Sequence, residues 1–499
     1  MRLMILALSA GAVAGVVYVR GTLQDTSMRL GQAGQTVSMQ GAEAMPEIHY
    51  ADGSPVDADP LVSDAVSERI HQVLRAKEER EATEVDADSG ESVPVPPSRP
   101  VRHSARLHDE MITPGNFKYL GAFRPPHIEN DGVTFGYGGW AMAYRPDGDP
   151  DSDDDGFPGS LYIVGHQQHQ KVAELSIPAP YVSKLKNADQ LPVADVLQSF
   201  GDITGGLQAS LSEGSSEPFQ IGGMIVTDGQ LHWTLHKYYN VEGVDYPSHG
   251  VTDLDLSSFS AEGPWHLGPM RSGRPEWHSY KHAGYIMEVP DAAADQWFGG
   301  RNLISGLQIS TGLQYSSQGP ALFAYRLPDG DVAAGQSLSA LPLCWYSEQN
   351  PMPGHHPADR WTGGAWLTLG DKQAIIVVGR KSHGAVYYGE PRPGDCSPYK
   401  GYHGPPYDVE VAFYSPASLI HAAHGQSPAL GLSPWLRWDT AFDGGSLSQY
   451  LFPTCGQDVG GIAYDRERNL IYLAQIDAAL TQDNQWEPLP VIHVFRIVE

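Results

Sequence analysis

Cysteine is scarce in this chain of 499 residues. Only Cys344, Cys396 and Cys455 are present, too few for a fold built on disulfides. Because the number is odd, at least one cysteine has no partner within the chain and is a buried thiol or a metal ligand. The sequence also lacks the G-x-S-x-G nucleophile elbow, the H-E-x-x-H zinc motif and the phosphate-binding P-loop. Enzymes that depend on those motifs are therefore excluded.

Positive charge is scarce as well. Lysine and arginine total 32, against 59 aspartate and glutamate residues, and the formal net charge is -27. Such a field repels nucleic acids and anionic lipid headgroups, and it favours solubility. We therefore expect a monomer with no nucleic-acid partner.

A long apolar run, LMILALSAGAVAGVVYV, occupies residues 3–19 between Arg2 and Arg20. Its length is marginal for a helix that crosses a bilayer, which needs about 20 residues. Two interpretations of residues 1–22 remain open: an uncleaved membrane anchor, or a signal peptide cut near the Ala/Gly cluster. We favour the anchor because Val16–Val19 extend the run past the small residues. Both interpretations predict export, with the rest of the chain periplasmic, at the cell surface or secreted.

Residues 23–110 are poor in aromatic residues and rich in Asp, Glu, Ser, Ala and Pro. Such a segment cannot bury enough apolar surface to offset the chain entropy lost on folding. We predict a disordered stalk, with one short helix from about Asp64 to Glu81 and an extended spacer at Pro94–Pro100.

From residue 111 to the end, turns rich in glycine, proline and aspartate separate short strand-like runs. One pattern recurs five times: a Gly-Gly or Ala-Gly step, a strand, a turn, a second strand and a later outer strand. The copies start at Gly138, Ile221, Ala283, Gly363 and Gly460. These units predict an all-β domain at residues 111–499, a β-propeller with five to seven blades. The alternative is a two-sheet sandwich.

Glycine at the start of each innermost strand suits a propeller. Backbones crowd near the axis, and a missing side chain lets them approach. The strand Asn116–Arg124 lies outside the first copy. We expect it to pair with the C-terminal strand VIHVFRIV and so to close the ring.

An acidic loop predicts calcium. Asp151, Asp153, Asp155 and Gly156 match the D-x-D-x-D-G start of a calcium loop, in which alternate carboxylates converge on one cation. The twelfth position is Tyr162 rather than Glu, which excludes an EF-hand. The alternative is an acidic hairpin between two strands.

A second loop predicts structural zinc. His383, Cys396 and His403 lie in one glycine- and proline-rich segment. Cysteine and histidine at such spacings can supply zinc ligands, with Cys455 or a solvent molecule as the fourth. The alternative is a buried thiol beside two surface histidines.

Histidines and tyrosines collect in the first three copies, near the ends of predicted inner strands. In a propeller these positions surround one mouth of the central channel. Histidine can remove a proton near neutral pH and tyrosine can protonate a leaving oxygen, so we predict a catalytic site. The alternative is structural, since both residue types are common in half-buried strands. The candidate catalytic residues are His166, His236, Tyr239 and Tyr285, within a wider group that includes His169, His232, Tyr238, His249, His278 and His282.

Several segments between Phe117 and Val498 are distinctive as a set: FGYGGWAMAY, DDGFPGSLYIVGH, VAELSIP, CSPYKGYHGPPY, VGGIAYDRERNLIYLAQ and PVIHVFRI. On them the chain resembles a broad family of exported bacterial β-propeller proteins whose activities are mostly unassigned. In architecture and residue types it also resembles the β-propeller ulvan lyases. That resemblance implies a His/Tyr site, a zinc-binding loop and an arginine that neutralises a uronate. After the Tyr-Tyr-Asn segment, where we look for the arginine, the chain has His249 and Thr252.

Two functions therefore remain open. The first is a polysaccharide lyase that cleaves a uronate-containing polysaccharide by β-elimination, with a local basic groove at Arg271, Arg274 and Lys281. The second is a non-catalytic propeller that binds a ligand or a protein at the cell surface, with membrane contact only through the N-terminal segment. A glycosidase with two carboxylates is a further alternative, although no motif joins the candidates Asp253, Glu276 and Asp465.

Overall fold

The structure is a computed structural model. It describes residues 111–499 except 131, 150–155, 213–217, 241–242, 259, 271–272, 308, 310–314, 328–329, 331 and 443, together with the backbone of five strands between residues 5 and 48. The chain divides into two compact units, Met1–Ala65 and Val66–Glu499.

The described part of the N-terminal unit is one antiparallel sheet, with its strands in chain order. These strands are β1 (Ile5–Ala10), β2 (Val13–Arg20), β3 (Ser27–Leu30), β4 (Thr36–Gln40) and β5 (Glu47–Ile48). Most of the apolar run at residues 3–19 thus belongs to β1 and β2. Among the residues that the structure describes, no helix has the length and apolar character to cross a membrane. The role of this segment as a leader stays a prediction, and the predicted helix and spacer lie outside the described residues.

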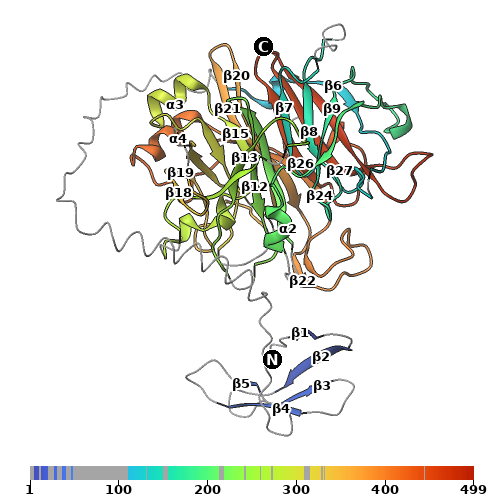
Figure 1. Cartoon of the computed structure of the whole chain (residues 1–499), viewed down its shortest axis with the longest axis vertical. Coiled ribbons are helices and arrows are strands. Elements are labelled where there is room, and N and C mark those ends of the chain that lie inside the picture. The colour runs from blue at the N-terminus through green and yellow to red at the C-terminus, as the bar shows by residue number, and fades with distance from the viewer. Residues whose placement is uncertain are drawn as a thin grey trace, which may run out of the picture. The chain divides into compact units, whose positions relative to one another are not determined.

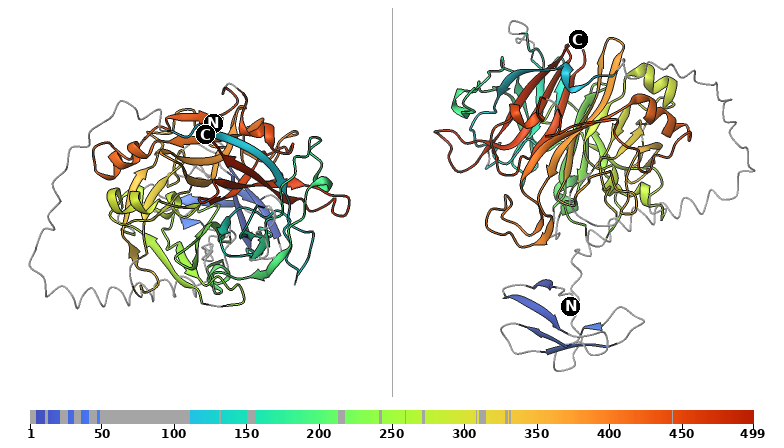
Figure 2. Two further views of the ribbon diagram at one scale, coloured as in Figure 1. Left: turned by 90° about the horizontal axis from the view of Figure 1, so that it is seen from above. Right: turned by 180° about the vertical axis from the view of Figure 1, so that it is seen from behind.

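From Met111 onward the chain forms a five-bladed β-propeller, which confirms the predicted fold class (Figures 1 and 2). Blade 1 contains β7 (Met142–Arg145), β8 (Ser160–Val164), β9 (Val172–Ser176) and β10 (Val196–Gly201). Blade 2 contains β11 (Gln220–Thr227), β12 (Gln230–His236), β13 (His249–Thr252) and β14 (Glu262–Leu267), with β18 (Ser337–Leu338) added in parallel at its edge.

The other three blades repeat this order from the axis outward. Blade 3 contains β15 (Ile286–Glu288), β16 (Leu303–Ser305), β17 (Leu322–Tyr325) and β19 (Ala340–Cys344). Blade 4 contains β20 (Arg360–Leu369), β21 (Lys372–Ser382), β24 (Tyr407–Tyr414) and β25 (Leu436–Trp438). Blade 5 contains β26 (Val459–Asp465), β27 (Leu470–Ala479), β28 (Leu489–Ile497) and β6 (Phe117–Phe123).

Small elements decorate the loops of the propeller. The α-helices that the structure describes are α2 (Leu207–Ser212), α3 (Asp291–Trp297) and α4 (Pro416–Ala423). The 3-10 turns are η1 (Pro114–Asn116), η3 (Ala188–Gln190), η4 (Pro275–Trp277), η5 (Ser279–Lys281) and η6 (Leu447–Tyr450). A separate hairpin joins β22 (Tyr387–Gly389) to β23 (Gly401–His403).

The ring is closed by the strand that the sequence predicted. β6, from the start of the domain, pairs antiparallel with the C-terminal β28, with Phe117 opposite Ile497 and Phe123 opposite Ile492. Blade 5 is therefore built from both ends of the domain. This pairing removes a free sheet edge and couples the two ends of the propeller in folding.

The glycine steps lie where neighbouring innermost strands meet. Gly461 of blade 5 donates a backbone hydrogen bond of 2.9 Å to the carbonyl of Gly139, which precedes blade 1. A Cβ atom on Gly223 of blade 2 would lie 2.4 Å from the carbonyl oxygen of Gly284, which precedes blade 3. Side chains are excluded at these points, which is the reason the step recurs.

The propeller has two distinct faces. Every innermost strand begins beside its glycines on one face and ends in a turn on the other, and we call these the glycine face and the turn face. The second strand of each blade ends at the glycine face, so the loops after β8, β12, β16, β21 and β27 lie there. In Figure 1, α2 and β22 lie at the glycine face, on the lower side of the propeller, and α3 lies at the turn face.

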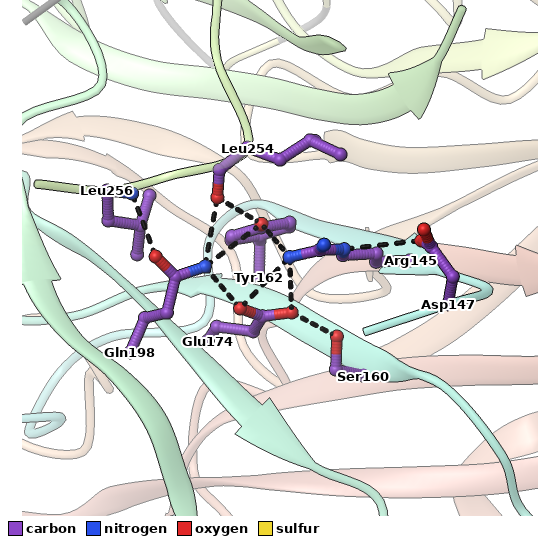
Figure 3. Close-up of polar contacts among 8 residues, drawn as sticks. All are labelled: Arg145, Asp147, Ser160, Tyr162, Glu174, Gln198, Leu254 and Leu256. Carbon is purple, nitrogen blue, oxygen red and sulfur yellow. Dashed lines mark hydrogen bonds and ion pairs between the residues drawn. The ribbon is translucent and has the colours of Figure 1, made fainter. Parts of the chain in front are cut away.

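A polar network fastens blade 1 to blade 2 (Figure 3). The Tyr162 hydroxyl donates a hydrogen bond of 2.6 Å to the carbonyl of Leu254, and Gln198 donates one of 2.9 Å to the same oxygen. The backbone N–H of Leu256 donates to the Gln198 side chain at 2.9 Å. Two strands of blade 1 thus hold the loop that follows β13 in blade 2.

A buried carboxylate organises this network from within blade 1. Glu174 on β9 accepts hydrogen bonds from Arg145 at 3.3 Å and from Ser160 at 2.5 Å, as Figure 3 shows. Arg145 also donates to the Tyr162 hydroxyl at 3.1 Å. Because the charge of Glu174 is paired and hydrogen-bonded, it is tolerated inside the blade.

Candidate functional site

Charged and aromatic side chains converge near the axis on the glycine face, at the end of the propeller that we call the mouth. Each belongs to the start of an innermost strand or to the end of a second strand. We call this set the mouth cluster. Its members are Tyr238, Arg360, Arg380, Asp458 and Asp477.

Two arginines in the cluster share one carboxylate. Arg360, the first residue of β20, donates from Nη1 to Asp458 at 3.4 Å, and Arg380, near the end of β21, donates from Nη1 at 3.0 Å. The side chains of Arg360 and Arg380 are 18% and 5% exposed. Burial and the charge of Arg360 lower the pKa of Arg380, while the charge of Asp458 opposes them. Two close cations with one shared anion favour a second anion beside them.

Both guanidinium groups are covered by tyrosine rings. Arg360 Cζ lies 5.5 Å from the ring centroid of Tyr238, and Arg380 Cζ lies 4.3 Å from that of Tyr407. The Tyr238 side chain is also hydrogen-bonded to Arg360. Such contacts stabilise a cation that has lost part of its water shell. Tyr238 follows β12 of blade 2 and Arg360 belongs to blade 4, so the two meet across the axis.

A second ion pair fixes the strand ends that carry the arginines. Lys381 Nζ lies 2.6 Å from Asp359 Oδ2, and the backbone N–H of Ser382 donates to Asp359 Oδ1 at 2.9 Å. All three residues are buried. Asp359 directly precedes Arg360 and Lys381 directly follows Arg380, so this pair sets the position of one arginine relative to the other.

Asp477 completes the cluster from β27. Its backbone is left-handed, with φ of 55°, and the pairing of β27 with β28 is irregular between Gln475 and Ala479. Its side chain reaches solvent. The surrounding protein and the charge of Asp458 nevertheless raise the pKa of Asp477 to about 6, against the opposing charge of Arg360. A carboxyl group with such a pKa can give or take a proton near neutral pH.

The rim of the mouth on the side of blade 1 carries His166 and Tyr137. Their ring centroids are 5.5 Å apart in an edge-on contact, and His166 Nε2 lies 3.7 Å from Glu487. Burial lowers the pKa of His166. The pKa of Tyr137 is raised by burial and then by the charges of Asp477 and Glu487. His166 therefore contacts Tyr137, whose pKa is raised by the charge of Asp477.

The other predicted catalytic residues occupy different surroundings. His236 ends β12 and is buried against Gly222, and burial lowers its pKa to about 4. Tyr239 is half-buried in the loop that follows β12. Tyr285 is buried, and its hydroxyl donates to the carbonyl of Ala321 at 2.7 Å and accepts from the N–H of Ala321 at 3.1 Å. The Tyr285 hydroxyl is therefore bonded to the backbone inside blade 3.

The predicted zinc ligands are not gathered around one point. Cys396 forms a disulfide with Cys455. The prediction of Cys396 as a zinc ligand is corrected by this bond, because zinc binds the thiolate form. His403 is buried with Nε2 3.2 Å from the carbonyl of Gly389, whereas His383 is exposed.

The third cysteine and the acidic loop were the other candidates for metal ligands. Cys344 is a free buried cysteine, as the odd number of cysteines required. Within the described residues, no group of three or more His, Cys, Asp or Glu side chains is arranged to hold a metal ion. Asp151, Asp153 and Asp155 lie outside the described residues, so calcium at that loop stays a prediction.

A cavity of about 260 Å³ opens at the turn face, at the other end of the channel. Arg466 spans part of its rim through an ion pair of 3.5 Å with Glu288. The walls come from all five innermost strands and combine many apolar side chains with the charged Glu288, Asp465, Arg466 and Glu467. Among the wall residues are Met142, Met224, Met287, Ala365 and Ile462.

Sequence reasoning included Tyr238 in its wider group but missed the four charged members of the mouth cluster. A signal for three of them was present in the repeats. Arg360 and Asp458 stand shortly before the glycine steps of their copies, and Arg380 falls near the end of a second strand, as His236 does. For Asp477 we find no such signal, because its position depends on an irregular strand pairing.

Comparisons with known proteins do not identify a family for this chain. No family model and no curated protein matches the chain. Among solved structures, a luciferin-regenerating enzyme is 10% identical with a TM-score of 0.27, over 68% of this chain and 75% of that chain. The PQQ-bound aldose sugar dehydrogenase of Streptomyces coelicolor is 12% identical with a TM-score of 0.26, over 76% of this chain and 97% of that chain. At these scores neither likeness bears on activity.

Proposed function

We propose that this protein is an exported polysaccharide lyase that cleaves a uronate-containing polysaccharide at the mouth on the glycine face. One observation carries the proposal: Arg360 and Arg380 share Asp458, with Tyr238 against one guanidinium group and Asp477 nearby. A uronate carboxylate is a planar anion of the kind that guanidinium groups bind through paired hydrogen bonds. In this proposal blade 4 supplies the arginine that the resemblance to ulvan lyases requires.

The cluster contains the roles that β-elimination needs. The two arginines neutralise the carboxylate of the sugar, which makes the neighbouring C5 proton more acidic. Tyr238, beside Arg360, removes that proton. The bond between C4 and the glycosidic oxygen then breaks, a C4–C5 double bond forms, and the oxygen takes up a proton. His166 on the rim would contact the adjoining sugar.

The disulfide supports export. Bonds of this kind persist in oxidising compartments outside the cytoplasm. Cys396 and Cys455 are separated by 59 positions and join the loop after β21 to the loop before β26. Arg380 and Asp458 border these same loops, so the bond also restrains the two sides of the proposed site.

A product assay tests the proposal. The purified protein is incubated with a panel of uronate polysaccharides and with one neutral polysaccharide, and ultraviolet absorbance reports the unsaturated product. We expect product from at least one uronate polymer, and its loss in Arg360→Gln and Tyr238→Phe. Tyr181→Phe, at an exposed tyrosine between β9 and β10, is the matched control. Binding of the polymers without any cleavage would instead identify a non-catalytic binding propeller.

Hydrolysis is a second candidate, and the two carboxylates of Asp458 and Asp477 favour it. Their surroundings differ, because Asp458 is bonded to two guanidinium groups whereas the pKa of Asp477 is raised to about 6. Pairs of unlike carboxyl groups act as acid and nucleophile or base in glycosidases. New reducing ends without ultraviolet absorbance would identify this reaction.

A further inference from the structure

Asp477 has a backbone conformation that is unusual for its residue type. A φ of 55° is left-handed, and residues other than glycine adopt it rarely, although Asp and Asn tolerate it best. The residue lies in the irregular part of the pairing between β27 and β28. Irregular pairings of this type redirect a side chain, and they recur beside active sites.

The neighbours of Asp477 define where the side chain is directed. The preceding residue, Ile476, donates its backbone N–H to the carbonyl of Asp458 at 3.0 Å. The Ile476 side chain packs at the axis, where a Cβ on Gly460 would lie 2.8 Å from its Cδ1 atom. Asp477 thus directly follows a residue that is bonded to Asp458, and its side chain reaches solvent.

Burial raises the pKa of the Asp477 carboxyl, and two charged groups act on it as well. Asp458, before β26, raises that pKa further, and Arg360, on β20, lowers it. Tyr137, before β7, feels the charge of Asp477 in turn. Arg380 stands behind Asp458, is buried, and has an Nε–H without an acceptor among the described atoms. The mouth therefore combines an accessible acid with buried donors suited to an anion.

We propose that Asp477 is the proton donor to the leaving glycosidic oxygen, and that a sugar carboxylate bound at Arg360 and Arg380 keeps it protonated. This inference rests on the proposed function. During β-elimination Tyr238 takes the C5 proton, the electron pair of that C–H bond forms the C4–C5 double bond, and the C4–O bond breaks. The leaving oxygen takes the proton of Asp477. One proton enters the protein at Tyr238 and one leaves at Asp477, so the step balances.

Protonation of Asp477 should be coupled to binding of the sugar carboxylate because the two charges interact. A bound carboxylate adds a negative charge beside Asp477 and offsets the positive charge of Arg360. Both changes favour the protonated form of Asp477. Binding of a uronate must therefore draw a proton from solution at a pH near or above 6, where free Asp477 is largely ionised.

Proton uptake can be measured without any cleavage. D-Glucuronate is the probe, and calorimetric titration at neutral pH in two buffers of different ionisation enthalpy gives the protons taken up per ligand bound. We expect a net uptake approaching one proton for the unaltered protein. We expect no uptake in Asp477→Asn, which tolerates the same backbone conformation, while glucuronate still binds. Asp483→Asn, at an exposed aspartate in the next loop, should behave like the unaltered protein.

The outcomes separate the two proposals. Binding without proton uptake, or uptake that persists in Asp477→Asn, overturns the assignment of Asp477 and leaves the anion site standing. No binding of glucuronate overturns both. With a cleavable polymer, Asp477→Asn should lose most turnover while KM changes little, and the fall in kcat as pH rises should disappear. A matched thermal unfolding curve confirms that the variant is folded.

Discussion

Arg380 donates a hydrogen bond of 3.0 Å to Asp458, and this bond joins the second strand of blade 4 to the residue that precedes blade 5. The same carboxylate accepts from Arg360 at 3.4 Å, so a single aspartate organises two guanidinium groups. The arrangement places two guanidinium groups beside one shared carboxylate in a chain of net charge -27. A ligand is therefore attracted by the cluster and not by the protein as a whole.

Removing one guanidinium should weaken anion binding selectively. For Arg360→Gln we expect glucuronate affinity to fall by about tenfold to a hundredfold, since a hydrogen bond to a charged group contributes about 1.5–3 kcal/mol. Calorimetric titration measures the change. Arg466→Gln removes a partly buried arginine at the turn face and is the control. Equal losses in both variants would show that binding depends on net charge and would contradict a specific site.

Breaking the Cys396–Cys455 disulfide should destabilise the propeller. The bond closes a long loop, and such bonds typically contribute about 2–4 kcal/mol. Cys396→Ser should therefore lower Tm, and a reductant should lower Tm of the unaltered protein but not of this variant. Cys344→Ala removes the free thiol and should leave the effect of the reductant unchanged. If a reductant has no effect on the unaltered protein, the pairing is wrong.

The contact between blades 1 and 2 should depend on the Tyr162 hydroxyl. Tyr162→Phe removes the bond of 2.6 Å to Leu254, and we expect the free energy of unfolding to fall by about 1–2 kcal/mol. Denaturant unfolding measures the change. Tyr181→Phe, at a half-exposed ring, is the matched control and should change little. A neutral result for Tyr162→Phe would mean that Gln198 alone holds the loop.

The glycine contacts at the axis should tolerate no side chain. A Cβ on Gly461 would lie 2.3 Å from the backbone nitrogen of Met142, so Gly461→Ala must push blades 5 and 1 apart. Overpacking of this kind destabilises by about 1–3 kcal/mol or more. Gly389→Ala is the control, because a Cβ there meets no atom within 4 Å. Thermal unfolding of the two variants provides the comparison, and equal Tm values would contradict close packing at the axis.

Asp477 should also make stability depend on pH. Its pKa is about 6 in the folded protein, above the usual value of the unfolded chain, so the folded state binds more protons between those two values. Stability should therefore decrease as pH rises from about 4 to about 6. In Asp477→Asn this decrease should be smaller. Urea unfolding at a series of pH values measures both curves, and parallel curves would contradict the raised pKa.

Five recurring units, within a range of five to seven blades, could be predicted from local sequence because each unit follows from short-range patterns. Glycine steps, alternating apolar residues and turn residues mark Gly138–Gly139 or Gly460–Gly461 as the start of an innermost strand without knowledge of its neighbours. The closing strand Asn116–Arg124 was predictable for a related reason, since a strand left outside the repeats needs a partner. The structure confirms the propeller and its closure by the pairing of β6 with β28.

The residues that meet in the mouth cluster could not be predicted from short-range sequence patterns. Tyr238, Arg360 and Asp458 are separated by about a hundred residues each, and only closure of the ring brings them to one end of the axis. Tyr285 was predicted as a catalytic residue because it follows a glycine step. Its place in the strand instead directs the hydroxyl to the carbonyl of Ala321, inside blade 3.

Local patterns in the chain predicted where the five innermost strands start and which strand closes the ring. The packing of the blades, in contrast, sets which charges meet, which cysteines pair and which aspartate lies beside Asp458. A strand forms in response to its neighbours along the chain, whereas the charge, burial and direction of a side chain in the mouth depend on blades that lie far away in sequence.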